Sequence, residues 1–378
     1  MKRRDFLRLA TALPFMGLLP SWASAKGGTG QRILVLVKLA GGNDGLNTLI
    51  PHADPLYYQL RPTVAIPQHQ VLDIGQGMGL NPYLQALKPL WDAGQMAWVQ
   101  GVGYPQGDLS HFRSNDIWET ASNASEYLND GWLARAVSPQ AGLHGIIMGD
   151  QMGPLAGKDC HALAMQSPQV FLSQVSLVED IQPVRVNPAL AHLTNIQHQL
   201  YGAGQQIGSK LQRPAPLGVN FATSEIGRDL ESVAKMIVSG VDALAYLVTL
   251  DGFDTHVNQN VTQSNLLHHL AGGLDSFAQA MKRAGRWDDV LVVTYSEFGR
   301  RAQENHGKGT DHGTASVQLV LGGKVRGGIY GDAPRLNALD SDGNPHHTVD
   351  FRQVYGTVAQ RWLGQSNPWA KFGTLPFV

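Results

Sequence analysis

Five short runs of apolar, largely β-branched residues determine the kind of fold that this sequence can adopt. The runs show no polar–apolar alternation, which is typical of strands that a parallel sheet buries on both faces. Residues 266–281 repeat apolar side chains at steps of three and four, which predicts a helix before the fourth run. Strand–helix–strand alternation favours an α/β fold with a doubly wound, mostly parallel sheet flanked by helices. The runs lie at 33–39 (ILVLVKL), 96–102 (MAWVQGV), 244–250 (LAYLVTL), 290–295 (VLVVTY) and 315–321 (ASVQLVL).

The middle of the chain follows a less regular pattern. The stretch HGIIMGD at 144–150 predicts a short strand, whereas 187–202 and 223–239 predict helices that each open with a capping residue. A last helix is predicted over 350–363, packed on the sheet. We interpret the chain as a signal peptide over 1–25 and one α/β domain over 26–378, in which about 140–240 forms a helical insertion or cap.

The first 25 residues have the pattern of an export signal. A twin-arginine pair, Arg3 and Arg4, precedes an apolar stretch and an Ala-Ser-Ala cleavage pattern at 23–25. A membrane anchor is the competing interpretation, but two prolines interrupt the apolar stretch, which is shorter than the ~20 residues that a bilayer requires. We expect export by the twin-arginine translocase to the periplasm or the medium, without a stable membrane anchor.

Composition excludes several classes of function. The chain has a formal net charge of −1 with acidic and basic side chains mixed along it, so nothing indicates a nucleic acid or an anionic membrane surface as partner. Its one cysteine, Cys160, excludes an internal disulfide even in an oxidising compartment. Stability must therefore come from the core or from bound metal.

Polar residues that follow the apolar runs are the candidates for a site, because open α/β sheets bind ligands outside the carboxyl ends of their strands. The first run leads into GGNDGLN at 41–47, whose glycines allow a close backbone approach to a ligand. Neither Gly-x-Gly-x-x-Gly nor Gly-Lys-Ser/Thr is present, so a nucleotide fingerprint is absent. Asp44 is therefore a candidate metal ligand. The alternative is a turn in which Asn43 and Asp44 bond to their own backbone.

The run at 244–250 leads into DGFDTHVNQ. Asp254 and His256 offer a carboxylate and an imidazole at a buried strand end, a combination suited to a metal with oxygen and nitrogen ligands. The alternative is the capped start of a helix, in which Asp254 or Thr255 bonds to backbone amides. The spacing of these residues leaves both interpretations open.

The run at 290–295 leads into SEFGRR. Glu297 is a candidate ligand or proton carrier, and Arg300 is a candidate clamp for an oxyanion; a structural ion pair between them is the alternative. The loop QENHGKGTDHGT at 303–314 then brings Asp311 and His312, with glycine on both sides of the pair. Among the histidines, His256 and His312 fit the pattern of ordinary core residues least.

The segment YPQGDLSHFRSNDIWET at 104–120 predicts a loop followed by a helix. Ser110 stands at the predicted N-cap, where the field of the helix stabilises negative charge, as a serine nucleophile would require. A simple capping role is the alternative. His111 and Arg113, on the same turns, favour a functional role for this segment.

Together these motifs resemble the DUF1501 family of exported bacterial proteins. The resemblance covers the mature chain and rests on GGNDGLN, SHFRSND, LDGFDTHVNQ, VVTYSEFGRR and GTDHGTASVQLVLGGKVRGGIYGD, in this order behind the twin-arginine signal. That family is similar to the alkaline phosphatase/sulfatase superfamily, which implies a doubly wound α/β fold with a divalent metal centre at its strand ends. By motif order, the resemblance implies a metal-ligand set of Asp44, Asp254, His256, Glu297, Asp311 and His312, with Ser110 near the nucleophile.

The sequence departs from the related hydrolases in two places. Ser-Glu-Phe-Gly stands where they show Ser-Asp-His-Gly, so Phe298 replaces one imidazole ligand. Cys160 lies in KDCHALA, not in a Cys-x-Pro-Ser-Arg motif, which disfavours a formylglycine-type sulfatase.

These features predict an exported, metal-dependent hydrolase of phosphate or sulfate esters. The resemblance implies a divalent metal (Zn, Mn, Mg or Ca) that polarises the ester oxygen, with Arg113 or Arg300 neutralising the oxyanion. Ser110 or a metal-bound water would attack. The alternative is a non-catalytic exported binding or assembly protein on the same fold, since one fold hosts many activities.

Overall fold

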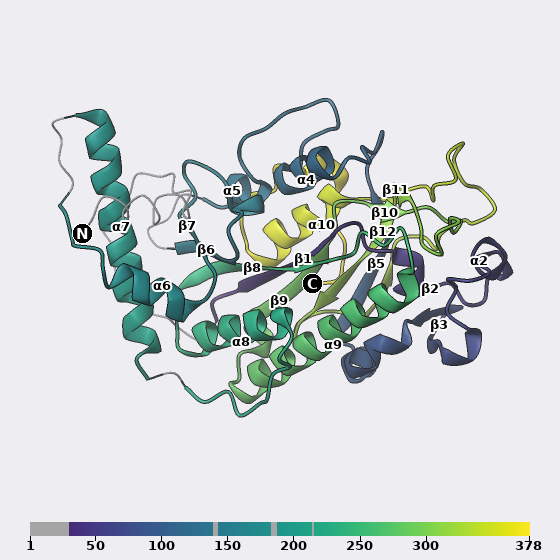
Figure 1. Cartoon of the computed structure of the whole chain (residues 1–378), viewed down its shortest axis with the longest axis horizontal. Helices are drawn as coiled ribbons and strands as arrows, with labels where there is room; N and C mark the ends of the chain where they lie inside the picture. Colours follow the sequence, from purple (N-terminus) through teal and green to yellow (C-terminus); the bar gives the residue numbers. More distant parts are fainter. Residues whose placement is uncertain (1–29, 139–142, 183–186, 214) are drawn as a thin grey trace.

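The computed structural model in Figure 1 describes residues 30–138, 143–182, 187–213 and 215–378. The predicted export signal lies outside the described residues. None of the helices in these ranges combines the length and the apolar character that a bilayer crossing requires.

A mixed, mostly parallel sheet runs through the centre of the molecule (Figure 1). Across the described ranges it has nine strands, in the order β13-β5-β12-β9-β1-β8-β6-β7 with β14 beside β5. β1 pairs in parallel with β8 and β9, and β12 runs antiparallel to β9 and β5. The strands are β1 (Ile33–Ala40), β5 (Met96–Gly103), β6 (Leu143–Met148), β7 (Ala162–Met165), β8 (Ala243–Asp251), β9 (Val290–Tyr295), β12 (Ser316–Leu321), β13 (Gly328–Tyr330) and β14 (Val349–Asp350).

Helices cover both faces of this sheet, so the predicted doubly wound α/β class is confirmed. Alternate residues of β1 point into two different cores: Val35 packs in one with α8 and α9, and Leu36 in the other with α4, α5 and α10. Burial on both faces explains why the strand runs show no alternation. The α-helices are α2 (Pro55–Leu60), α3 (Lys88–Asp92), α4 (His111–Thr120), α5 (Trp132–Ala136), α6 (Pro168–Val175), α7 (Pro188–Leu211), α8 (Glu225–Val238), α9 (Gln259–Arg283) and α10 (Phe351–Thr357).

The segment interpreted as an insertion or cap contributes strands as well as helices. β6 pairs in parallel with β8, and β7 continues the sheet beyond β6. α6 and α7 pack against each other at this end of the sheet, and α8 packs beside α9 (Figure 1). α8 begins with Ser224, whose hydroxyl accepts a hydrogen bond from the Gly227 amide.

The carboxyl ends of β1, β8 and β9 meet at one edge of the sheet because these strands are parallel. A short hairpin of β10 (Gly299–Arg300) and β11 (His312–Gly313) follows β9 and pairs Arg300 with His312. A small separate sheet contains β2 (Leu49–Ile50), β3 (Leu72–Gly75) and β4 (Met78–Leu80). The hairpin brings the 303–314 loop back to the edge where β8 ends.

Candidate metal centre

Three side chains from separate parts of the chain form a group that could hold a metal ion. One ligand atom each from His111, Asp254 and His312 lies within 4.8 Å of the others. His111 is the first residue of α4, Asp254 follows β8, and His312 opens β11. His256 joins the group, since its ring centroid lies 4.7 Å from that of His312.

Three donor atoms in this cluster converge closely. Nε2 of His256 lies 2.9 Å from Nε2 of His312, and Oδ1 of Asp254 lies 3.0 Å and 3.2 Å from these two nitrogens. Ligand bonds of roughly 2.0–2.1 Å place neighbouring donors about 2.9 Å apart around an octahedral ion and about 3.3 Å apart around a tetrahedral one. The three separations therefore match the spacing of three donors on one triangular face of an octahedral or a tetrahedral coordination shell.

Hydrogen bonds at the opposite ring nitrogens set the tautomers of both histidines. Nδ1 of His312 lies 2.8 Å from the Leu109 carbonyl oxygen, which can only accept, so Nδ1 carries the proton. Nδ1 of His256 faces Oδ1 of Asp311 at 3.4 Å, and the Asn305 amide holds that carboxylate from 2.9 Å. Each Nε2 is then left with a lone pair, as metal ligation requires.

The charges at the cluster favour a bound cation. Burial would raise the pKa of Asp254, but neighbouring groups, with the Arg300 guanidinium foremost among them, outweigh it and lower the pKa to about 2. Burial lowers the pKa of His312, which keeps its imidazole neutral. Where neither Nε2 carries a proton, two lone pairs and a carboxylate oxygen face one another within 3.2 Å. Their mutual repulsion is relieved by a shared proton or a cation.

A buried carboxylate orients His111 toward this cluster. Oε1 of Glu297 accepts from Nδ1 of His111 at 2.9 Å and from the Gly41 amide at 2.8 Å. The other ring nitrogen, Nε2, faces Oδ2 of Asp254 at 3.6 Å. Glu297 thus contacts the cluster through His111.

Asp44, the predicted ligand after β1, has its carboxylate turned to Arg61. The two side chains form a buried, two-pronged ion pair with contacts of 2.5 and 3.1 Å, and are 1% and 0% exposed. Gln259 and the Leu46 amide also donate to this carboxylate. The sequence analysis missed Arg61 because nothing in its local sequence distinguishes it from an ordinary surface arginine.

Of the two predicted oxyanion clamps, Arg300 contacts the cluster through Oδ1 of Asp254 at 2.8 Å, whereas Arg113 is turned to a neighbouring loop. Arg300 is fully buried and donates to the carbonyls of Gly41, Gly42 and Phe253, as well as to Asp254. Arg113 donates to the carbonyls of the 123–126 loop, and its guanidinium stacks on Tyr127 at 3.9 Å. Both guanidinium groups thus tie backbone segments together.

Ser110 occupies the predicted N-cap of α4. Its side chain is exposed and does not cap the helix, while its carbonyl accepts from the Ser114 amide. Leu109, which holds His312, and His111 are its neighbours in the chain. The hydroxyl therefore stands at the edge of the cluster.

The first two glycines of GGNDGLN make room for other segments of the site. Both have positive φ angles, 114° at Gly41 and 81° at Gly42. A Cβ on Gly41 would lie 2.3 Å from the Asp254 amide nitrogen, and one on Gly42 would lie 2.3 Å from the Phe298 ring. That ring packs against His312 with centroids 4.3 Å apart, so it gives the cluster an apolar wall.

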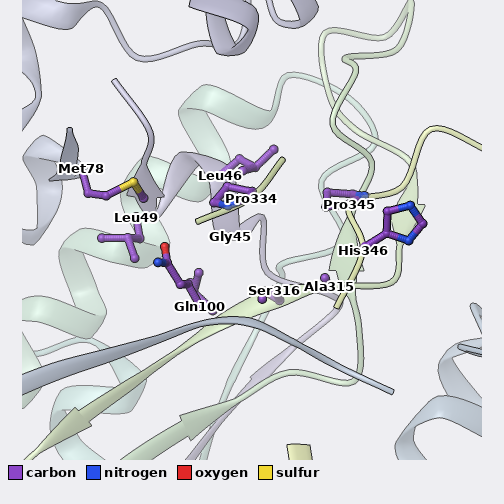
Figure 2. Close-up of a pocket in the computed structure, with 12 residues that line it drawn as sticks. Gly45, Leu46, Leu49, Met78, Gln100, Ala315, Ser316, Pro334, Pro345 and His346 are labelled. Atoms are coloured by element: carbon purple, nitrogen blue, oxygen red, sulfur yellow. The ribbon is translucent and has the colours of Figure 1, made fainter. Parts of the chain in front are cut away.

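A small cavity lies behind the first-strand loop, on the side of Gly45 and Ser316 (Figure 2). Its volume of about 20 Å³ has room for about one water molecule. Gln100 lines it, and the buried Oε1 of this side chain has no hydrogen-bond partner. The cavity includes none of the cluster residues, so it is separate from the candidate centre.

The chain is therefore a mixed α/β protein that carries a cluster of histidines and a carboxylate at the strand ends of its sheet. A sequence model of the family described as "Protein of unknown function (DUF1501)" matches residues 234–361, which carry every cluster residue except His111. Over that stretch the chain is similar to the DUF1501 family, in agreement with the motifs. No curated protein matches the chain.

Several solved structures align with most of this chain at low similarity. The C-terminal periplasmic domain of EcEptC from Escherichia coli, in complex with Zn, aligns at 10% identity with a TM-score of 0.40, over 93% of this chain and 88% of that one. The lipoteichoic acid synthase LtaP from Listeria monocytogenes aligns at 11% identity with 0.38, over 92% and 76%. The phosphonate monoester hydrolase SpPMH from Silicibacter pomeroyi aligns at 12% identity with 0.36, over 92% and 76%. Scores of this size do not carry the function of those proteins over to this chain.

Proposed function

We propose that this protein is a metal-dependent hydrolase of phosphate or sulfate esters. The observation that carries the proposal is the convergence of Asp254 Oδ1, His256 Nε2 and His312 Nε2 within 3.2 Å, with both opposite ring nitrogens directed to oxygen acceptors. Two imidazoles and one carboxylate suit zinc better than magnesium or calcium, which prefer all-oxygen sites. We leave Asp44 out of the proposed ligand set because Arg61, Gln259 and the Leu46 amide all donate to its buried carboxylate.

The protein's own groups would supply the general base, the nucleophile and the stabilisation of the anionic group. A divalent cation supplies Lewis acidity toward an ester oxygen. His111, held by Glu297, would take the proton of the attacking group as a general base, since its Nε2 faces the cluster. The free amides of the first turn of α4 would stabilise the anionic group, with Ser110 as the candidate nucleophile.

The non-catalytic alternative is favoured by one observation. Arg300 is held by backbone carbonyls and Asp254, and Nη2 of Arg113 donates to the carbonyls of a neighbouring loop, so neither guanidinium is directed at a substrate oxyanion. A protein that only binds would require the metal-ligand cluster, but it would not require the hydrogen-bonded pair of Glu297 and His111.

The first test separates these two functions. Purified mature protein should contain metal and hydrolyse members of a phosphate and sulfate ester panel, and a chelator should lower the rate about a hundredfold or more, with recovery on addition of Zn²⁺. A metal-free protein that stays inactive after addition of Zn²⁺, Mn²⁺, Mg²⁺ or Ca²⁺ would exclude the hydrolase.

Glu297→Gln tests the division of roles. If Glu297 positions His111, the variant should keep its metal content while kcat falls by about a hundredfold or more, since general bases contribute roughly 10²–10⁴-fold. Asp311→Asn, beside His256, is the matched control and should affect metal affinity more than kcat at saturating metal. Loss of metal from Glu297→Gln would make Glu297 a ligand.

We also propose that residues 1–25 direct export through the twin-arginine translocase to the periplasm or beyond. The arginine pair and the cleavage pattern support this. Cell fractionation with an Arg3→Lys, Arg4→Lys variant tests it.

A further inference from the structure

A buried glutamine joins the two segments that carry most of the metal-ligand cluster. Gln259 is the first residue of α9 and is 0% exposed. Its Oε1 accepts hydrogen bonds from the hydroxyls of Thr255, at 3.2 Å, and Thr310, at 2.6 Å. Thr255 stands between the two candidate ligands that follow β8, and Thr310 lies two residues before His312. One side-chain oxygen therefore holds both segments that supply the three converging ligand atoms.

Asp44 determines which way the Gln259 amide points. An ionised carboxylate can only accept, so the atom of Gln259 that bonds to Oδ2 of Asp44 is the amide nitrogen, Nε2. The same nitrogen faces Oε1 of Gln263 at 3.3 Å. With its nitrogen on these two acceptors, the amide presents its oxygen to the two threonine hydroxyls. The buried charge of Asp44 thus reaches the ligand segments through Gln259.

The two threonine hydroxyls are sensitive to the loss of this oxygen. Thr255 is 3% exposed and Thr310 is 0% exposed, and a buried hydroxyl without an acceptor is costly. A backbone hydrogen bond of 3.3 Å from the Thr310 amide to the Thr255 carbonyl joins the two segments to each other. The Gln259 side chain adds a link from both segments to the loop after β1. Without that link we expect the segments to shift relative to this loop.

We infer that Gln259 is a positioning residue of the metal centre and that Asp44 orients it. This inference rests on the metal site of the proposed function. Metal affinity depends on ligands that are held at the spacing the ion requires, and partners outside the ligand set commonly contribute roughly 10–100-fold to it. Asp44 would then support metal binding without contacting the metal.

Titration of the mature protein with Co²⁺, followed by visible absorption, reports both the metal affinity and the geometry of the ligands. Gln259→Met should weaken Co²⁺ binding about tenfold or more and change the spectrum of the bound ion. Gln263→Met is the matched control, because Gln263 is 2% exposed, lies one turn further along α9 and donates to Asn43 and the Asp44 carbonyl. It should lower the urea midpoint as Gln259→Met does, and leave the Co²⁺ affinity and spectrum unchanged.

Thr310 provides a second pair of variants in which Gln259 stays in place. Thr310→Val removes the hydroxyl and should weaken Co²⁺ binding, whereas Thr310→Ser keeps a hydroxyl and should retain the wild-type affinity. The double variant Gln259→Met, Thr310→Val should bind Co²⁺ no more weakly than Gln259→Met alone, because both substitutions remove the same hydrogen bond. This pair decides the question if Gln259→Met does not fold.

Three results would overturn the inference and leave the proposed metal site intact. They are unchanged Co²⁺ affinity in Gln259→Met, an equal loss in Gln263→Met, and equal affinities of Thr310→Val and Thr310→Ser. The second would show that the loss of affinity comes from the stability of the fold. If the unsubstituted protein does not bind Co²⁺, the metal site of the proposed function falls together with this inference.

Discussion

His256→Ala is expected to abolish metal binding and, with it, hydrolysis. The substitution removes one of three donors that lie within 3.2 Å of one another, so metal affinity should fall by more than the roughly 10–100-fold typical for loss of an outer-shell partner. Elemental analysis after dialysis gives the metal content, and the ester panel gives the rate.

A second histidine serves as the matched control for that substitution. His268 lies exposed on α9, and His268→Ala should leave metal content and rate unchanged. Full metal occupancy in His256→Ala would remove His256 from the ligand set.

Arg61→Met is expected to destabilise the fold strongly. It leaves the carboxylate of Asp44 buried without its charge partner, and breaking a buried pair in this way costs about 3–5 kcal/mol. Urea denaturation followed by circular dichroism measures the loss. The double variant Asp44→Asn, Arg61→Met should recover part of it, because no unpaired charge remains.

An exposed ion pair provides the comparison for Arg61. Lys88 and Asp92 are paired at 2.5 Å on the surface of α3, and Lys88→Met should cost at most about 0.5 kcal/mol. Equal effects of Arg61→Met and Lys88→Met would show that the Asp44 pair does not anchor the first-strand loop.

The sheet could be predicted because its signal is local. A strand buried on both faces must be apolar throughout, and the run 290–295 coincides with β9 (Val290–Tyr295). The order of the strands depends on pairing between distant segments. Nothing in the run 315–321 indicated that β12 would lie antiparallel between β9 and β5.

Only the site residues that follow a strand end could be predicted from the sequence. Asp254 and His256 follow β8 directly, so the parallel sheet rule placed them at the edge. His312 reaches the edge through the β10–β11 hairpin, which the sequence did not predict. The partner of Asp44 could not be predicted, because Arg61 meets it through tertiary packing.

Anomalous scattering from crystals of the metal-loaded protein shows directly whether Asp254, His256 and His312 bind the metal. We expect one strong peak within bonding distance of Asp254 Oδ1, His256 Nε2 and His312 Nε2. A peak beside Asp44, or no peak near the three donors at saturating zinc, would contradict it.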